Sequence, residues 1–136
     1  MNSFTEFTTL GDLLIKSADK FGSNPVIVFP EQRISYEELK QRSYCRAQAL
    51  VAHDIGPGSH VGILMANCME YIEYLFAAQL IGAMAVPINA RYKAPELAYV
   101  LDNADIDLLV THDAISEYAN FGQLIDDALV ENTSQR

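Results

Sequence analysis

The sequence predicts an α/β fold: a βαβαβ parallel sheet with flanking helices and a short N-terminal hairpin. The main observation is an alternation of strand, helix, strand, helix and strand over residues 60–111, with short connections. Strands that are joined through helices lie parallel in one sheet, with right-handed crossovers. A second observation is the pair of β-rich runs "PVIVF" and "RIS", which flank "PEQ" and predict the hairpin.

Two helices are expected around the hairpin. The first spans residues 10–21, and Gly22 ends it. Its apolar residues recur at helical spacing: Leu13, Leu14, Ala18 and Phe21. The second helix runs to His53, and Ser35 and Glu38 have the spacing of a capping box at its start. Its apolar face comprises Leu39, Ala47, Leu50 and Val51.

The alternating region begins after the turn "DIGPGS", with a strand at residues 60–65. Asn67 is the expected N-cap of a helix over residues 68–81, and Gly82 is expected to end it. Pro87 suits a strand end, where one backbone donor is dispensable. The remaining elements are a strand at 83–88, a helix at 95–102 that starts with Pro95, a strand at 106–111, a helix at 121–129 and a polar tail at 130–136.

The charge balance excludes two classes of partner. The chain has 9 basic and 18 acidic residues, and a net charge of −9. Nucleic acids and anionic membrane surfaces are bound by clustered lysine and arginine, so neither is expected as a partner. The longest apolar run, residues 75–90, contains Gln79, Gly82 and Pro87 and is too interrupted to be a transmembrane segment.

The cysteines and histidines do not predict a metal site. Cys45 and Cys68 form no CxxC motif and have no histidine at ligand spacing, which favours a reducing, cytoplasmic location. The three histidines are isolated and are expected on the surface or in loops: His53, His60 and His112.

Two motifs resemble those of a known superfamily. "ISYEEL" (residues 34–39) and "LIGAMAVPIN" (residues 80–89) are similar to the first two core motifs of the adenylate-forming enzymes, the AMP-binding superfamily. This superfamily includes acyl-CoA synthetases, peptide-synthetase adenylation domains and luciferases. The flanking segments look most like those of acyl-CoA synthetases and fatty-acid–CoA ligases, and the resemblance covers about residues 8–113.

The sequence departs from the family pattern at two places. Ala94 stands where relatives usually carry serine or threonine, so the next helix loses a capping oxygen at a cost of about 1 kcal/mol. Ser59 and His60 stand where an Asp-Arg pair is common, which is expected to change the surface charge only.

The resemblance implies a two-step reaction in the complete enzyme. A carboxylic acid and ATP, with Mg²⁺, give an acyl-adenylate, and coenzyme A then accepts the acyl group. The family's Ser/Thr/Gly-rich ATP loop and catalytic lysine have no counterpart in this sequence. Residues 1–136 are therefore expected to be an incomplete N-terminal segment of an AMP-binding domain. The segment is predicted to be inactive alone, with no catalytic or metal-binding residue, and to need the remainder of the ligase domain as its partner.

Arg91 is the one candidate ligand-binding residue. It lies in "NARYK", directly after the second strand of the βαβαβ run. Ligands of open α/β sheets bind at the carboxyl ends of the strands, so Arg91 is a candidate for the nucleotide phosphates of coenzyme A. The alternative is a solvated loop arginine that pairs with a surface carboxylate.

A stand-alone α/β interaction module is the competing function. The helix at 69–81 is apolar on nearly every side, so further protein is expected to cover it, or a partner to dock near Tyr71, Tyr74 and Phe76. Glu70 and Glu73 lie three residues apart on this helix. Their position in its first turn is attributed to the helix dipole and not to a paired-carboxylate site.

Overall fold

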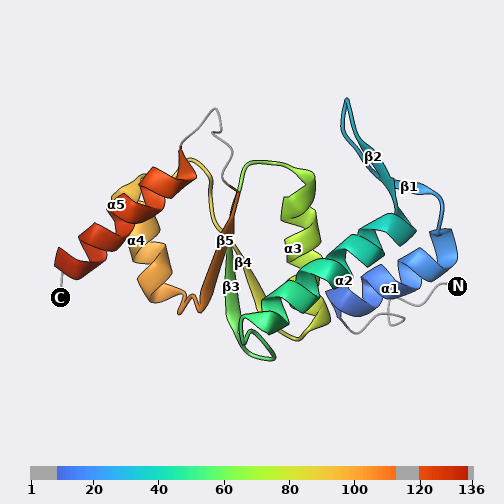
Figure 1. Cartoon of the computed structure of the whole chain (residues 1–136), viewed down its shortest axis with the longest axis horizontal. Helices are drawn as coiled ribbons and strands as arrows, with labels where there is room; N and C mark the ends of the chain where they lie inside the picture. The colour runs from blue at the N-terminus through green and yellow to red at the C-terminus, as the bar shows by residue number, and fades with distance from the viewer. Residues whose placement is uncertain (1–8, 113–119, 135–136) are drawn as a thin grey trace, which may run out of the picture.

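The computed structural model describes residues 9–112 and 120–134 (Figure 1). The elements are α1 (Leu10–Phe21), β1 (Pro25–Val28), β2 (Arg33–Ser35), α2 (Tyr36–Ala52), β3 (His60–Leu64), α3 (Met69–Leu80), β4 (Met84–Pro87), α4 (Ala94–Asn103), β5 (Leu108–Thr111) and α5 (Phe121–Ser134). β1 and β2 form the expected antiparallel hairpin, and β4, β3 and β5 form a parallel sheet in that order. The predicted α/β fold class is confirmed.

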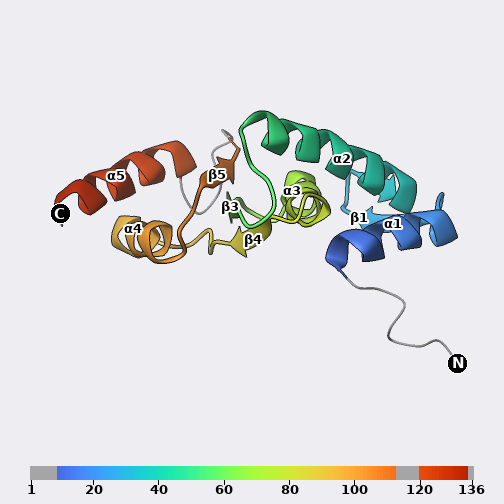
Figure 2. The same cartoon turned by 90° about the horizontal axis from the view of Figure 1, so that it is seen from below.

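The parallel sheet is wound in both directions from its central strand. The chain leaves β3, passes through α3 and returns at β4, then passes through α4 to reach β5 on the other side of β3. Right-handed crossovers in opposite directions place their helices on opposite faces of a sheet. Figure 2 shows this arrangement, with α1, α2 and α3 on one side of the sheet and α4 and α5 on the other.

The central strand has the burial expected of a strand that is covered on both faces. Val61, Ile63 and Leu64 have no solvent exposure. Val61 pairs with Ala85 of β4 and Leu108 of β5. Helices on both faces of a parallel sheet explain why this strand is a continuous apolar run and not an alternating one.

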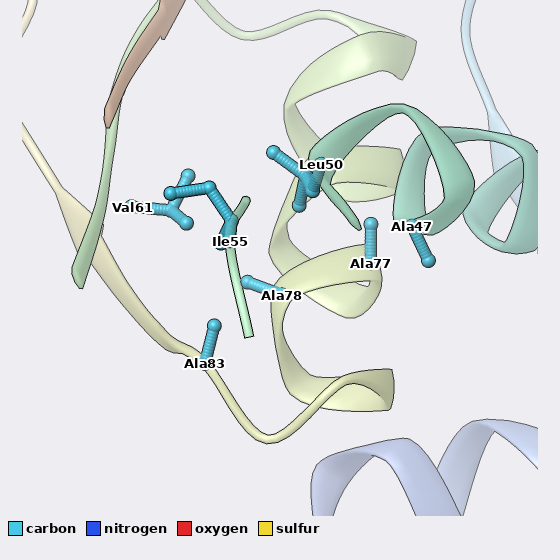
Figure 3. Packing of buried hydrophobic residues seen from close by; sticks show 7 residues of the cluster. All are labelled: Ala47, Leu50, Ile55, Val61, Ala77, Ala78 and Ala83. Carbon is cyan, nitrogen blue, oxygen red and sulfur yellow. The ribbon is translucent and has the colours of Figure 1, made fainter. Parts of the chain in front are cut away.

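Small side chains allow the helices to approach the sheet closely. Figure 3 shows the cluster between α2, α3 and the sheet, which comprises Ala47, Leu50, Ile55, Val61, Ala77, Ala78 and Ala83. A second cluster joins the opposite face of the sheet to α4 and α5, with Leu64, Leu97 and Phe121 among its members. A third joins α1, the hairpin, α2 and α3 through residues such as Leu14 and Ile34.

The helix boundaries confirm several sequence predictions. Ser35 and Glu38 form the capping box: the Glu38 backbone N–H donates to Ser35 Oγ at 3.2 Å, and the Ser35 N–H donates to Glu38 Oε2 at 2.8 Å. Gly22 follows α1 with φ 29°. Gly82 has φ 74° and follows α3 in a Schellman arrangement, because its N–H donates to the Gln79 carbonyl and the next N–H donates to that of Ala78.

Other helix ends differ from the prediction. Cys68, not Asn67, occupies the N-cap of α3. α4 begins at Ala94, so Lys93 is its N-cap and the residue at 94 is already helical. α5 continues past Leu129 through residues 130–134, where the Thr133 hydroxyl donates to the Val130 carbonyl at 2.8 Å inside the helix. Polar residues do not by themselves end a helix, and no glycine or proline follows Leu129.

Two predicted core residues lie on the surface. Val51 is 55% exposed and Phe21 is 40% exposed. Each is at the last turn of its helix, where the neighbouring elements no longer cover it. The Phe21 ring instead packs on Tyr36, with 5.4 Å between ring centroids.

The cover that α3 needs comes largely from this chain. α1, α2 and the sheet surround the helix, and Tyr71, Tyr74 and Phe76 are half-buried. Phe76 packs in the third cluster and Tyr74 against the first. The apolar composition of α3 is thus explained within the described residues, and the surface near its tyrosines is not a fully exposed docking face. Across residues 9–112 and 120–134, no helix combines the length and apolar character that a membrane span requires.

Candidate functional site

A cleft lies at the carboxyl ends of β3 and β4, where the chain winds away in opposite directions. We call it the switch-point cleft; it has a volume of about 490 Å³. Its polar lining includes Asn67 and Tyr71 from the β3–α3 side and Asn89 and Arg91 from the β4–α4 side. In open α/β sheets this is the position where ligands bind. The structure therefore brings the predicted residue Arg91 into a cleft of ligand size.

The loop that carries Arg91 is fixed by its own hydrogen bonds. The Arg91 backbone N–H donates to Asn89 Oδ1 at 3.0 Å, and the Tyr92 N–H donates to the Asn89 carbonyl at 3.1 Å. The Lys93 N–H donates to Glu96 Oε2 at 2.9 Å, which starts α4. This accounts for how α4 begins without a serine or threonine at position 94. Arg91 is exposed and lines the cleft, whereas Lys93 is exposed but does not line it.

The other side of the cleft supplies neutral polar groups. Burial raises the pKa of the Tyr71 hydroxyl, so it remains a hydrogen-bond donor at neutral pH. Cys68, at the start of α3, does not line the cleft; burial raises the pKa of its thiol, so it stays protonated and is not an activated nucleophile. Together with Arg91, the cleft offers one cation and several neutral donors, which suits an anionic group of a ligand.

A buried carboxylate is the feature that sequence reasoning missed. Glu73 is 2% exposed and accepts hydrogen bonds from Arg46 Nε at 2.8 Å and from Arg42 Nη1 at 3.4 Å. The first-turn explanation holds for Glu70 but is wrong for Glu73, which clamps α3 to α2. A carboxylate within an apolar helix was the available signal, because such a group is buried only with a cationic partner. The cationic partners were also visible in the sequence: Arg42 and Arg46 lie four residues apart on α2.

His60 and the "GPGS" turn contribute to structure. The ring nitrogen Nδ1 of His60 lies 2.6 Å from the Ala104 carbonyl oxygen, and the backbone N–H of His60 donates to Asp107 Oδ2 at 2.8 Å. His60 thus joins β3 to the turn before β5, so the expectation of a change in surface charge only is wrong. Gly58 has φ 85° in the turn before β3, which lies at the end of the sheet opposite the cleft. The described ranges contain no group of three His, Cys, Asp or Glu residues arranged to hold a metal.

Comparison with known proteins gives a consistent result. The family model described as AMP-binding enzyme matches residues 14–135. The acyl-CoA ligase sidI of Aspergillus fumigatus is 38% identical over 103 residues, which are 74% of this chain and 18% of that protein. Tyrocidine synthase 1 of Brevibacillus parabrevis is 25% identical over 114 residues, which are 84% of this chain and 10% of that protein.

The solved structures agree with the sequence comparison. The inhibitor-bound crystal structure of the N-terminal domain of FACL13 from Mycobacterium tuberculosis has a TM-score of 0.75 and 28% identity, over 77% of this chain and 27% of that one. The chain spans 18–20% of the length of the acyl-CoA synthetase and ligase relatives that it matches. Since the family match extends over residues 14–135, the chain belongs to the AMP-binding enzyme family and is most like the N-terminal part of acyl-CoA synthetases.

Proposed function

We propose that this chain is the N-terminal segment of an ATP-dependent acid–CoA ligase. The observation that carries the proposal is the AMP-binding family match over residues 14–135. The choice of coenzyme A as acceptor is supported by sequence identity. Relatives named acyl-CoA ligases are 34–38% identical, whereas those whose names contain a peptide, tyrocidine, mycosubtilin or surfactin synthase are 25–30% identical.

The residues of this chain do not fit the phosphate chemistry of ATP. Stabilising a triphosphate requires aimed backbone amides, a lysine and a metal ion. The only glycine pair at close spacing, Gly56 and Gly58, lies at the opposite end of the sheet from the switch-point cleft. We assign adenylation, with its Mg²⁺, to the remainder of the ligase domain, which would also complete the carboxylic-acid site.

Arg91 is the residue of this segment that we assign to coenzyme A. It lines the switch-point cleft on a loop that Asn89 holds in place, and its guanidinium can pair with a phosphate through two parallel hydrogen bonds. Asn67 and Tyr71 lie across the cleft as neutral donors. Coenzyme A, when bound, supplies the thiol that accepts the acyl group; this segment contributes binding and orientation of its nucleotide end.

Arg91→Ala is expected to weaken the binding of coenzyme A to the chain by about tenfold, the usual cost of a charge-assisted hydrogen bond. The measurement is isothermal titration with coenzyme A at low salt, repeated with dephospho-coenzyme A to identify which phosphate is contacted. Lys93→Ala is the matched control, because it removes the same charge two residues away but does not line the cleft. An equal loss of affinity for both variants would remove Arg91 from the site.

The absence of an ATP loop predicts that the chain alone does not activate acids. Pyrophosphate release from ATP and Mg²⁺ is measured with a panel of aliphatic and aromatic carboxylic acids. We expect no acid-dependent release above the level without protein. Acid-dependent turnover by the purified chain would contradict the assignment of adenylation to the remainder of the enzyme. Coenzyme A binding without turnover is the combination that the proposal requires.

A further inference from the structure

A second cleft lies on the other side of β3, at the carboxyl ends of β3 and β5. We call it the Arg46 cleft. Its volume is about 460 Å³, within the range of small-molecule sites. Its lining includes Arg46, Glu70, Tyr74, Met65, Thr111 and His112. Arg91 does not line it, and the role proposed above for coenzyme A does not use it.

The arginine in this cleft is held in one orientation. Arg46 Nε donates to the buried Glu73 carboxylate at 2.8 Å, and its guanidinium lies over the Tyr74 ring at 5.3 Å. The hydrogen bond to Glu73 raises the pKa of Arg46. The two terminal nitrogens of Arg46 donate no hydrogen bond to another residue of the described ranges. They form the planar, bidentate edge that matches a carboxylate.

A second lining residue has a polar atom with no hydrogen-bond partner in the described part of the chain. His112 Nδ1 is buried and has no hydrogen bond to any residue in the described part of the chain. A buried polar atom of this kind costs free energy unless a ligand or water satisfies it. Thr111 Oγ1 donates to the Leu64 carbonyl at 2.7 Å, so its hydrogen is already used and its oxygen can only accept.

The charges of the cleft restrict the ligand. Glu70 lies near Arg46, so the cleft holds one guanidinium and one carboxylate. Glu70 and Glu73 repel a dianion such as phosphate. They repel a ligand with a single carboxylate less strongly, because it carries only one negative charge. Met65 and the Tyr74 ring give the cleft an apolar wall for the hydrocarbon body of such a ligand.

We propose that the Arg46 cleft binds a monocarboxylate, with Arg46 pairing with the carboxylate and His112 Nδ1 as a second contact. Glu73 is the positioning residue, because its carboxylate fixes the orientation of Arg46. Without such a role, the burial of this carboxylate would only cost free energy. A latch between α2 and α3 is the simpler role for Glu73. Two hydrophobic residues would hold α2 against α3 without the desolvation of the Glu73 carboxylate.

To test this, the chain is titrated with benzoate at pH 7 and low salt, and binding is monitored by ¹H–¹⁵N NMR and by calorimetry. We expect saturable binding, with shifts at residues of the Arg46 cleft. Arg46→Gln is expected to weaken it at least tenfold. Glu73→Gln is expected to weaken it as well, because Arg46 loses its fixed orientation. Arg42→Gln is the matched control: it removes the same charge and also contacts Glu73, but it does not line the cleft. The affinity of Arg42→Gln for benzoate is expected to stay within threefold of that of the original chain.

Several results would overturn the proposal. Non-saturable binding of benzoate would do so, and so would equal losses of benzoate affinity for Arg46→Gln and Arg42→Gln. Phosphate binding as tight as benzoate binding would also contradict it. Loss of benzoate binding in Arg91→Gln would place the ligand in the switch-point cleft. If Glu73→Gln does not fold by circular dichroism, Arg46→Lys takes its place. Arg46→Lys keeps the charge but lacks the planar edge, so unchanged affinity in that variant also contradicts the proposal.

Discussion

Gly82 is the residue on which the return from α3 to the sheet depends. Its φ of 74° is a left-handed conformation that side chains other than glycine adopt at a cost of about 1–2 kcal/mol. Its carbonyl also accepts a hydrogen bond from the Gly58 N–H at 3.0 Å, and a Cβ at this position would lie 3.4 Å from the Pro57 ring. The conformation and the contacts together link the end of α3 to the turn before β3.

Gly82→Ala is therefore expected to destabilise the chain by about 1–2 kcal/mol, measured by urea unfolding. Gly56→Ala is the matched control in the neighbouring turn. No atom lies within 4 Å of a Cβ built at Gly56, and its φ is not in the left-handed range, so a change within about 0.5 kcal/mol is expected. A Gly82→Ala chain as stable as the original would show that the turn relaxes without strain.

At the scale of one element, the start of α2 has a pH dependence. The backbone N–H of Ser35 donates to the Glu38 carboxylate and lowers its pKa. A carboxylate whose pKa is lower in the folded state stabilises the fold above its unfolded pKa, and the effect is lost as pH falls through the folded pKa. This contribution is thus complete at neutral pH and disappears in acid below pH 4.5, the reference pKa.

Glu38→Gln separates this effect from the other carboxylates. Glutamine can still reach the Ser35 N–H but does not titrate between pH 2 and 7. We expect the variant to have a lower melting temperature than the original chain at pH 7, and the difference to vanish towards pH 2. A difference that is constant over this range would mean that the charge of Glu38 does not contribute to the capping box.

The elements that the sequence predicted best are those with local signals. The capping box at Ser35, the left-handed Gly82 and the alternation from β3 to β5 depend on neighbours in the chain, so one sequence suffices to predict them. Burial at helix ends was predicted less well, because exposure of Val51 and Phe21 depends on which distant element stops covering them. The same applies to Glu73, whose partners lie 27 and 31 residues away on α2.

At the scale of the whole molecule, the candidate site follows from topology. The sequence predicted that Arg91 lies after the second parallel strand, and the strand order β4-β3-β5 places it in a cleft. The sequence did not predict the Arg46 cleft. Its walls come from α2, α3 and the end of β5, which are far apart in the chain, and no local pattern brings these elements together.

The charge of the chain is divided unevenly between these parts. Residues 1–93 carry nine acidic and eight basic residues, whereas residues 94–136 carry nine acidic residues and only Arg136 as a base. Arg91 and Arg46 both lie in the nearly neutral part, and α4 and α5 lie in the acidic part. An anionic ligand is thus attracted to the two clefts only by short-range contacts, since the net field of the molecule repels it. Added salt should therefore weaken its binding less than it weakens binding to a basic surface.

The winding of the sheet also predicts the order in which its backbone opens. β3 is paired on both sides and its Val61, Ile63 and Leu64 are fully buried, whereas β4 and β5 each pair on one side within the described residues. Amide hydrogen exchange of the chain in native buffer is expected to be slowest in β3, at least tenfold slower than in β4 or β5, because opening β3 requires the loss of both ladders. Exchange in β5 as slow as in β3 would contradict this order. It would mean that the free edge of β5 is covered in solution, for example by a second copy of the chain, and a faster β5 rate on dilution would identify that case.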